Sequence, residues 1–210
     1  MTREENLFLI HKHIKEYIYN SAKLEGLGLT YPETETILDG FAPNVPLNEA
    51  IAVNNLKRAW TFIEETADIP LTFSYISEIN KHIGGDSLYP NAGLPRTAPV
   101  RIGGTSWQPE IPIIEQIENE LSDILKIENK LEQAINIFLY IMRKQIFIDG
   151  NKRTANIVAN KIMLMHNQGV LSVPEKNIVE FRTLLIKFYE TDNYEEISKF
   201  IDEYCIFTQI

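Results

Sequence analysis

Apolar residues recur every three or four positions through most of the chain, which is the spacing of amphipathic helices. The first such stripe runs through residues 4–25 and ends at Gly26 and Gly28. The same spacing predicts further helices over 30–39, 47–66, 73–83, 113–127, 131–142, 152–167, 174–189 and 193–207. Residues 131–142 are the most evenly apolar, so we expect them to form a buried central helix. The pattern predicts an all-α fold.

Residues 84–112 interrupt this pattern with repeated glycines and prolines. Within them, Val100 and Ile102 flank Arg101, which is the alternation of a short strand. The pair Gly103-Gly104 follows and is a hairpin turn signal. We therefore expect a small β-hairpin in an otherwise helical chain.

Composition narrows the possible partners. The chain has 210 residues, enough for a single domain with a real core, and its net charge is −9. An acidic chain is a poor binder of nucleic acid or of anionic membranes, so we expect neither partner. No run approaches the length of a membrane-spanning helix, and the charged N-terminus lacks a signal-type apolar region. With Cys205 as the one cysteine, no internal disulfide can form, and we expect a cytoplasmic protein.

The residues that could form a functional site cluster in the stretch Gln145-Ile-Phe-Ile-Asp-Gly-Asn-Lys-Arg-Thr-Ala-Asn156. A turn signal centred on Gly150 separates the two flanking helices, and glycine lets the backbone approach a ligand closely. The first N–H groups of the outgoing helix lack internal acceptors, so this helix start can bind an anion. Lys152 and Arg153 lie in the first turn, where cations oppose the helix dipole unless something negative binds. Asp149 beside a phosphate could hold Mg²⁺. The alternative is a plain helix–loop–helix turn with solvated charges.

This stretch resembles the signature of the Fic family, His-x-Phe-x-(Asp/Glu)-Gly-Asn-(Gly/Lys)-Arg-x-x-Arg. The matching residues are Phe147, Asp149, Gly150, Asn151, Lys152 and Arg153. The resemblance implies a helical Fic domain that moves AMP from ATP onto a protein hydroxyl. It further implies these roles: Mg²⁺ binding for Asp149, a phosphate-holding loop for Gly150, Asn151 and Lys152, outer-phosphate contact for Arg153, and a core anchor for Phe147.

Two positions depart from the signature. The family's histidine, its general base, falls on Gln145, and an amide cannot accept a proton from a hydroxyl near neutral pH. The family's last arginine falls on Asn156, which leaves one cation fewer for the outer phosphates, although the position implies that Asn156 is one of the phosphate-binding residues. We therefore expect a nucleotide site with attenuated turnover.

The segment Ser21-Ala-Lys-Leu-Glu25-Gly26 resembles the inhibitory helix motif of many Fic proteins. There the serine orients the segment, and the glutamate pairs with the last arginine of the signature and blocks the productive γ-phosphate pose. Because Asn156 stands at that position, Glu25 could form only a hydrogen bond with it, which is weaker than a charge-assisted Glu–Arg pair. We therefore expect weaker inhibition by Glu25, or contact with Arg153 instead. On this basis residues 1–28 are an inhibitory helix packed on the domain, and residues 29–210 are the Fic core. Without the resemblance, Glu25 is a surface residue before a C-cap glycine.

The segment from Arg96 to Pro112 resembles the Fic flap, a β-hairpin over the active site that holds the target by strand addition. The flap would span about residues 93–112, with Val100, Arg101 and Ile102 against the target. The alternative is an ordinary surface hairpin. We also expect Trp107 to pack under the flap.

Three functional hypotheses remain open. The first is an attenuated Fic-type nucleotidyltransferase acting on a protein target or on itself, with ATP and Mg²⁺, in a possible homodimer. The second is an inactive module that binds a nucleotide or a peptide, and the third is transfer of a different group. His82 as a substitute base, and Tyr189 or Tyr194 as nucleotide contacts or self-modification sites, are secondary alternatives to plain structural roles.

Overall fold

The computed structural model describes residues 1–85 and 87–209, and these contain nine α-helices in the predicted order. Their bounds are α1 (Arg3–Glu25), α2 (Tyr31–Leu38), α3 (Leu47–Glu65), α4 (Phe73–Gly84), α5 (Ile114–Leu125), α6 (Lys130–Lys144), α7 (Asn151–Met165), α8 (Ile178–Thr191) and α9 (Glu195–Tyr204). A short 3₁₀ helix, η1 (Glu175–Asn177), precedes α8. The predicted all-α class is confirmed.

Two very short strands, β1 (Val170–Leu171) and β2 (Ile206–Phe207), form an antiparallel pair. The helix expected over 193–207 consequently ends at Tyr204, because Ile206 and Phe207 pair with β1 instead of continuing the helix.

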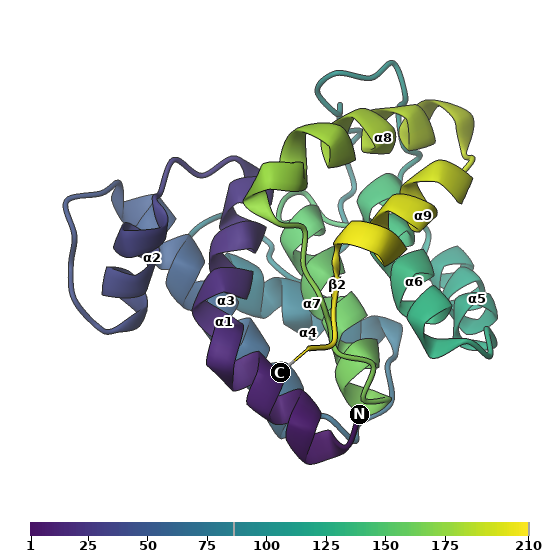
Figure 1. Cartoon of the computed structure of the whole chain (residues 1–210). Helices are drawn as coiled ribbons and strands as arrows, with labels where there is room; N and C mark the ends of the chain where they lie inside the picture. Colours follow the sequence, from purple (N-terminus) through teal and green to yellow (C-terminus); the bar gives the residue numbers. More distant parts are fainter. Residues whose placement is uncertain (86, 210) are drawn as a thin grey trace.

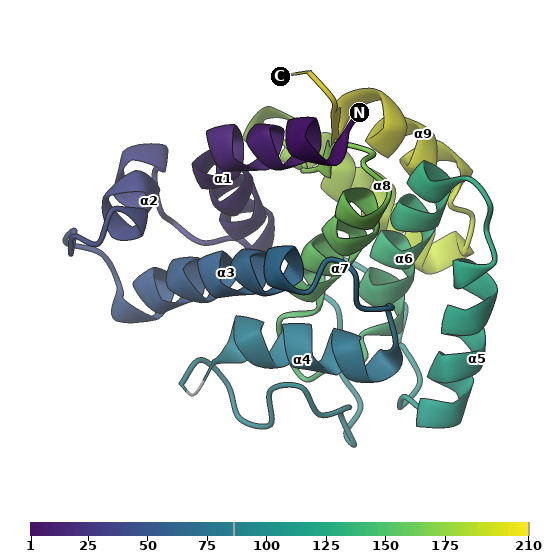
Figure 2. The same cartoon turned by 90° about the horizontal axis from the view of Figure 1, so that it is seen from below.

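Helix α7 is the centre of the molecule. It packs against α1, α3, α4, α6 and β1, and Figures 1 and 2 show the four helices arranged around it. Almost every residue of α7 is buried. The expectation that residues 131–142 form the central helix is therefore corrected: α6 is largely buried but packs along one side of α7. The hydrophobic pattern did not predict the central position of α7, because this helix buries polar side chains as well as apolar ones.

These buried polar side chains are all hydrogen-bonded, as buried polar groups must be. The amide of Asn160 donates to the carbonyl of Leu171 over 2.8 Å and accepts from its N–H over 2.9 Å. Lys161 donates to the carbonyls of Thr66 and Ala67 just past the end of α3. These bonds set the register of α7 against both β1 and α3.

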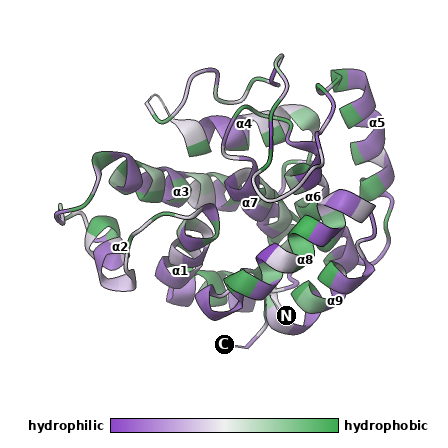
Figure 3. Cartoon of the chain, turned by 90° about the horizontal axis from the view of Figure 1, so that it is seen from above, coloured by the Kyte–Doolittle hydropathy of each residue, from purple (hydrophilic) through white to green (hydrophobic). Residues whose placement is uncertain are grey.

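The outer helices bury one face each. In Figure 3, α5 and α9 carry bands of both hydrophobic and hydrophilic colour, as expected of helices packed on one side only. Among the described helices, none combines the length and the apolar character needed to cross a membrane.

The segment between α4 and α5 contains the expected turn at Gly103 and Gly104, but residues 97–113 form no strand. The expected β-hairpin ladder is thus corrected to an irregular loop. Pro99, Pro109 and Pro112 cannot donate ladder hydrogen bonds, and this gives a physical reason for the missing strands.

Candidate functional site

The signature stretch folds as a tight loop between α6 and α7. Gln145 follows the last residue of α6 in the left-handed conformation (φ 49°), and Gly150 precedes α7 with φ 74°. The side chain of Asn151 braces the loop, because its Nδ2 donates to the carbonyl of Phe147 over 2.8 Å and its Oδ1 accepts from the Phe147 N–H over 3.0 Å. Phe147 itself is buried, as expected of an anchor.

The start of α7 has free hydrogen-bond donors. No side chain caps it. In the described part of the chain, the backbone N–H groups of Asn151, Lys152 and Arg153 have no acceptor; the next N–H, that of Thr154, bonds to the carbonyl of Gly150. Such a helix start attracts anions.

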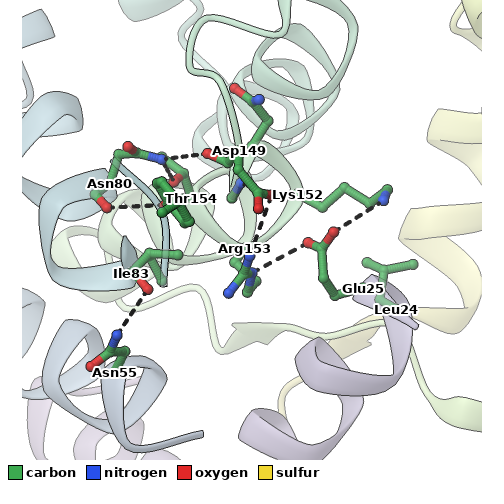
Figure 4. A network of polar contacts seen from close by, with 12 residues as sticks. Leu24, Glu25, Asn55, Asn80, Ile83, Asp149, Lys152, Arg153 and Thr154 are labelled. Carbon is green, nitrogen blue, oxygen red and sulfur yellow. Dashed lines mark hydrogen bonds and ion pairs between the residues drawn. The ribbon is translucent and has the colours of Figure 1, made fainter. Parts of the chain in front are cut away.

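Asn80 and Tyr89 support this loop from α4 and the segment after it. The buried Asn80 donates to the carbonyl of Asp149 over 3.1 Å and to Thr154 Oγ1 over 3.0 Å (Figure 4). A Cβ atom at position 150 would collide with the hydroxyl of Tyr89, so close packing as well as the positive φ requires glycine there. Burial raises the pKa of the Tyr89 hydroxyl, which keeps it neutral beside the loop.

Sequence reasoning missed both supporting residues. A signal existed for Asn80: it follows Ile79 on the buried face of α4, where a polar residue must have a specific partner. Tyr89 lay in the irregular segment and carried no such signal.

Glu25 at the end of α1 reaches the start of α7 (Figure 4). Its carboxylate lies 3.3 Å from Nε of Arg153 and 3.4 Å from Nζ of Lys152. Arg153 also lies 3.5 Å from the carboxylate of Asp149. Of the two contacts considered for Glu25, the one with Arg153 is therefore present.

Asn156 lies elsewhere. It is buried, and its amide donates to the carbonyl of Leu171 over 3.1 Å. Its assignment to the phosphate-binding residues is corrected, because this side chain is committed to β1 and does not reach Glu25.

The turn that presents Glu25 is held by Arg182 of α8. Arg182 donates to the carbonyls of Lys23 and Leu24 over 3.2 and 2.9 Å, and Gly26 closes the helix in the left-handed conformation. Ser21, expected to orient this segment, is buried, and its hydroxyl has no hydrogen bond to any described residue. The orienting contact from Arg182 was not visible in the sequence.

Gln145 has a structural role in place of a base. Its Nε2 donates to the carbonyl of Met142 over 2.6 Å, and its Oε1 accepts from Nδ2 of Asn151 over 3.2 Å. An amide can do both at once because it is donor and acceptor. His82 packs its ring on Phe62 of α3, at 4.6 Å between ring centroids, and burial lowers its pKa. Tyr189 is buried, whereas Tyr194 is exposed.

The loop over residues 97–112 is tied to the signature by Arg96. This buried side chain donates to the Gln145 carbonyl over 2.6 Å and to the Ala98 carbonyl over 2.8 Å. It also donates to the carbonyls of Pro109 and Glu110. The guanidinium of Arg96 thus links the beginning and the end of the loop to the backbone at position 145. These hydrogen bonds hold the loop in the way that the ladder of a β-hairpin would.

The tip of the loop is tied to α8. Glu190 accepts from the hydroxyls of Thr105 and Ser106 and from the Ser106 N–H, and these bonds lower the pKa of its carboxyl. Trp107 packs on the guanidinium of Arg143, 3.9 Å from ring centroid to Cζ.

The residues proposed to face a target keep their expected alternation even without strands. Val100 and Ile102 are half-buried, and Arg101 between them is exposed.

Asp149 is placed to serve as a single metal ligand. Its side chain is 52% exposed at the start of α7, next to the free N–H groups. Over the described residues, no three His, Cys, Asp or Glu side chains gather into a ready-made metal site. Mg²⁺ is often held by one or two carboxylates plus phosphate oxygens, so this donor set fits Mg²⁺ together with a nucleotide.

Fold and site together define a helical protein whose charged residues converge on the start of its central helix, with a loop bonded to the stretch that precedes this helix. Residues 70–163, which include α4, α5, α6 and most of α7, match the sequence model of the Fic/DOC family.

Solved structures share the fold over almost the whole chain. A Fic domain-containing signalling protein from Bacteroides thetaiotaomicron superposes with a TM-score of 0.79 at 19% identity, over 97% of this chain and 85% of that one. Fic-1 from C. elegans gives 0.75 at 20% identity, over 93% of this chain. A Fic family protein from Desulfovibrio desulfuricans gives 0.74 at 16% identity, over 95% of this chain.

The chain spans 61% of the C. elegans structure and 62% of the Desulfovibrio structure. No curated protein sequence gives a significant match.

Proposed function

We propose that this chain is a Fic-type nucleotidyltransferase that binds ATP and moves AMP to a protein hydroxyl at an attenuated rate. The observation that carries the proposal is the start of α7, where free N–H groups, Lys152 and Arg153 converge. The carboxylate of Glu25 already lies against both cations, so an anionic group has a place there. A phosphate would use the same donors.

The chain's own residues would hold the nucleotide in defined ways. The N–H groups of residues 151–153 would bind the phosphates, and Arg153 would contact the outer ones, stabilising the charge that develops during transfer. Bound between Asp149 and the phosphates, Mg²⁺ would neutralise further negative charge. The target segment, from another protein or from the chain itself, would lie along Val100, Arg101 and Ile102.

A second candidate is a nucleotide- or peptide-binding module without turnover. The hydrogen bonds of Gln145 favour the binding module, because its side-chain nitrogen and oxygen are both used to stabilise the loop. An amide also supplies no general base.

The direct test is calorimetric titration with ATP, with and without Mg²⁺, of the natural chain and of Asp149→Ala. We expect Mg²⁺ to strengthen ATP binding to the natural chain and to have no effect on the variant, because the variant lacks the metal-binding carboxylate. Asp39→Ala removes an exposed carboxylate from the end of α2 and is the control. An Mg²⁺-dependent affinity that survives in Asp149→Ala would refute the role of Asp149, and absence of ATP binding by the natural chain would refute the proposal.

Removing the carboxylate of Glu25 is expected to strengthen ATP binding by about tenfold, equivalent to roughly 1.4 kcal/mol. In the natural chain the phosphates must displace this carboxylate from Arg153 and Lys152. Calorimetry of Glu25→Gly measures the effect, and Glu25→Gln separates loss of charge from loss of the side chain. If neither variant changes ATP affinity or stoichiometry, Glu25 has no inhibitory role.

A further inference from the structure

A groove of about 580 Å³ lies on the α5 side of the tethered loop, in the size range of ligand pockets, roughly 300–1,000 Å³. Its walls come from residues 107–110, α5, α6 and the turn between α8 and α9, and it includes none of residues 149–153. A second hollow of about 220 Å³ shares Asn136 and Tyr194 with it and continues toward α9. The two hollows adjoin along α6, because both are lined by Asn136 of that helix and by Tyr194. We call the two together the α6 trough.

The rim of the trough carries an excess of negative charge. Arg143 and Lys144 are its cations in the larger hollow, and they pair with Asp192 at 3.1 Å and with Glu120 at 2.8 Å. Glu110 and Asp123 are the remaining carboxylates of that wall. Asp123 pairs with the highly exposed Lys126, and solvent screens such a pair strongly.

The neighbouring elements extend this charge. Helix α5 contains four acidic residues, Glu115, Glu118, Glu120 and Asp123, and no basic one. The smaller hollow adds Glu132 and Asp202, while its lysine, Lys199, pairs with Glu195.

The floor of the trough is apolar. Ile124 and Leu139 line it, together with the rings of Trp107 and Phe188, which lie against the guanidinium of Arg143. An apolar floor below an acidic rim suits a ligand with apolar side chains and cations in alternation. The continuous length along α6 suits an extended chain better than a compact molecule.

We propose that the α6 trough binds a basic, extended segment of a partner protein, with Lys or Arg side chains at the rim and apolar side chains on the floor. Like-charge repulsion disfavours a nucleotide or a nucleic acid there. It also disfavours a second copy of this chain, because the net charge of each copy is −9. The inference rests on the proposed function only in that the trough borders the loop where a target would lie; it adds the chemistry of the partner.

The test uses a fluorescently labelled, lysine-rich peptide with interspersed leucines, and the same peptide with glutamate in place of lysine. We expect the lysine peptide to bind the natural chain in anisotropy titrations, to weaken as salt is raised, and to change the fluorescence of Trp107. Trp60, the other tryptophan, is buried in the core, and Trp107→Phe identifies the source of the signal. The glutamate peptide should not bind.

The double variant Glu110→Gln/Asp123→Asn should bind the lysine peptide about fivefold more weakly, the effect of two exposed pairs. The matched control is Glu4→Gln/Glu65→Gln, which removes two exposed carboxylates from α1 and α3 and should bind as the natural chain does. No binding by the natural chain, or equal loss in the double variant and its control, would overturn the proposal. ATP titrations of the same variants should be unchanged, so failure of the trough and failure of the nucleotide site can be told apart.

Discussion

Replacing Gln145 with histidine is expected to raise the transfer of labelled AMP from ATP to protein by about 10²–10⁴-fold, the usual contribution of a general base. Histidine tolerates the left-handed conformation of position 145 better than most residues, so the loop should keep its shape. The carbonyl at this position can still accept from Arg96, because the change affects only the side chain.

Incorporation of label from ATP into protein measures this gain. Gln145→Asn is the matched control, since asparagine also suits the left-handed region but supplies no base. Strong labelling by Gln145→His alone would mean that the natural chain lacks only its base. Equal labelling by the natural chain would reveal another base, and ATP binding without labelling in any variant would favour the binding module.

Replacing Arg96 with methionine is expected to lower the free energy of unfolding by about 3–5 kcal/mol, because buried acceptors left without partners cost about 1–3 kcal/mol each. Arg96 donates to four backbone carbonyls, at Ala98, Pro109, Glu110 and Gln145. Arg96 therefore holds both ends of the loop to the signature stretch, while Glu190 holds its tip.

Urea unfolding of Arg96→Met measures the loss. The matched control is Arg101→Met in the same loop, where the arginine is exposed and the change should stay within about 0.5 kcal/mol. Arg96→Lys should recover only part of the loss, because an ammonium cannot reproduce the planar fork. Near-equal stability of Arg96→Met and Arg101→Met would contradict the role of Arg96.

The helices from α1 to α7 could be predicted closely because their signals are local. For α1, the stripe from residue 4 and the glycine at position 26 set both ends to within a residue. The central position of α7 could not be predicted, because Asn160 and Lys161 read as polar until their partners on β1 and after α3 are known.

The part of the candidate site that lies within one short stretch of sequence could be predicted. Gly150, Lys152 and Arg153 lie together because they are neighbours in the chain. Its supports come from distant segments: Asn80 reaches Asp149, and Arg182 reaches the end of α1. No spacing rule connects residues so far apart, and only the packed fold brings them together.

The buried bonds of Asn160 and Lys161 have a consequence at the opposite end of their helix. They fix α7 along its axis, so the N–H groups at its start already point in one direction before any anion arrives. Little conformational entropy is then lost on binding, and the site is preorganised. The affinity for phosphate should therefore depend mainly on how readily the Glu25 carboxylate, in the last turn of α1, leaves Lys152 and Arg153. Changes in that turn would then adjust the affinity of the site without altering α7.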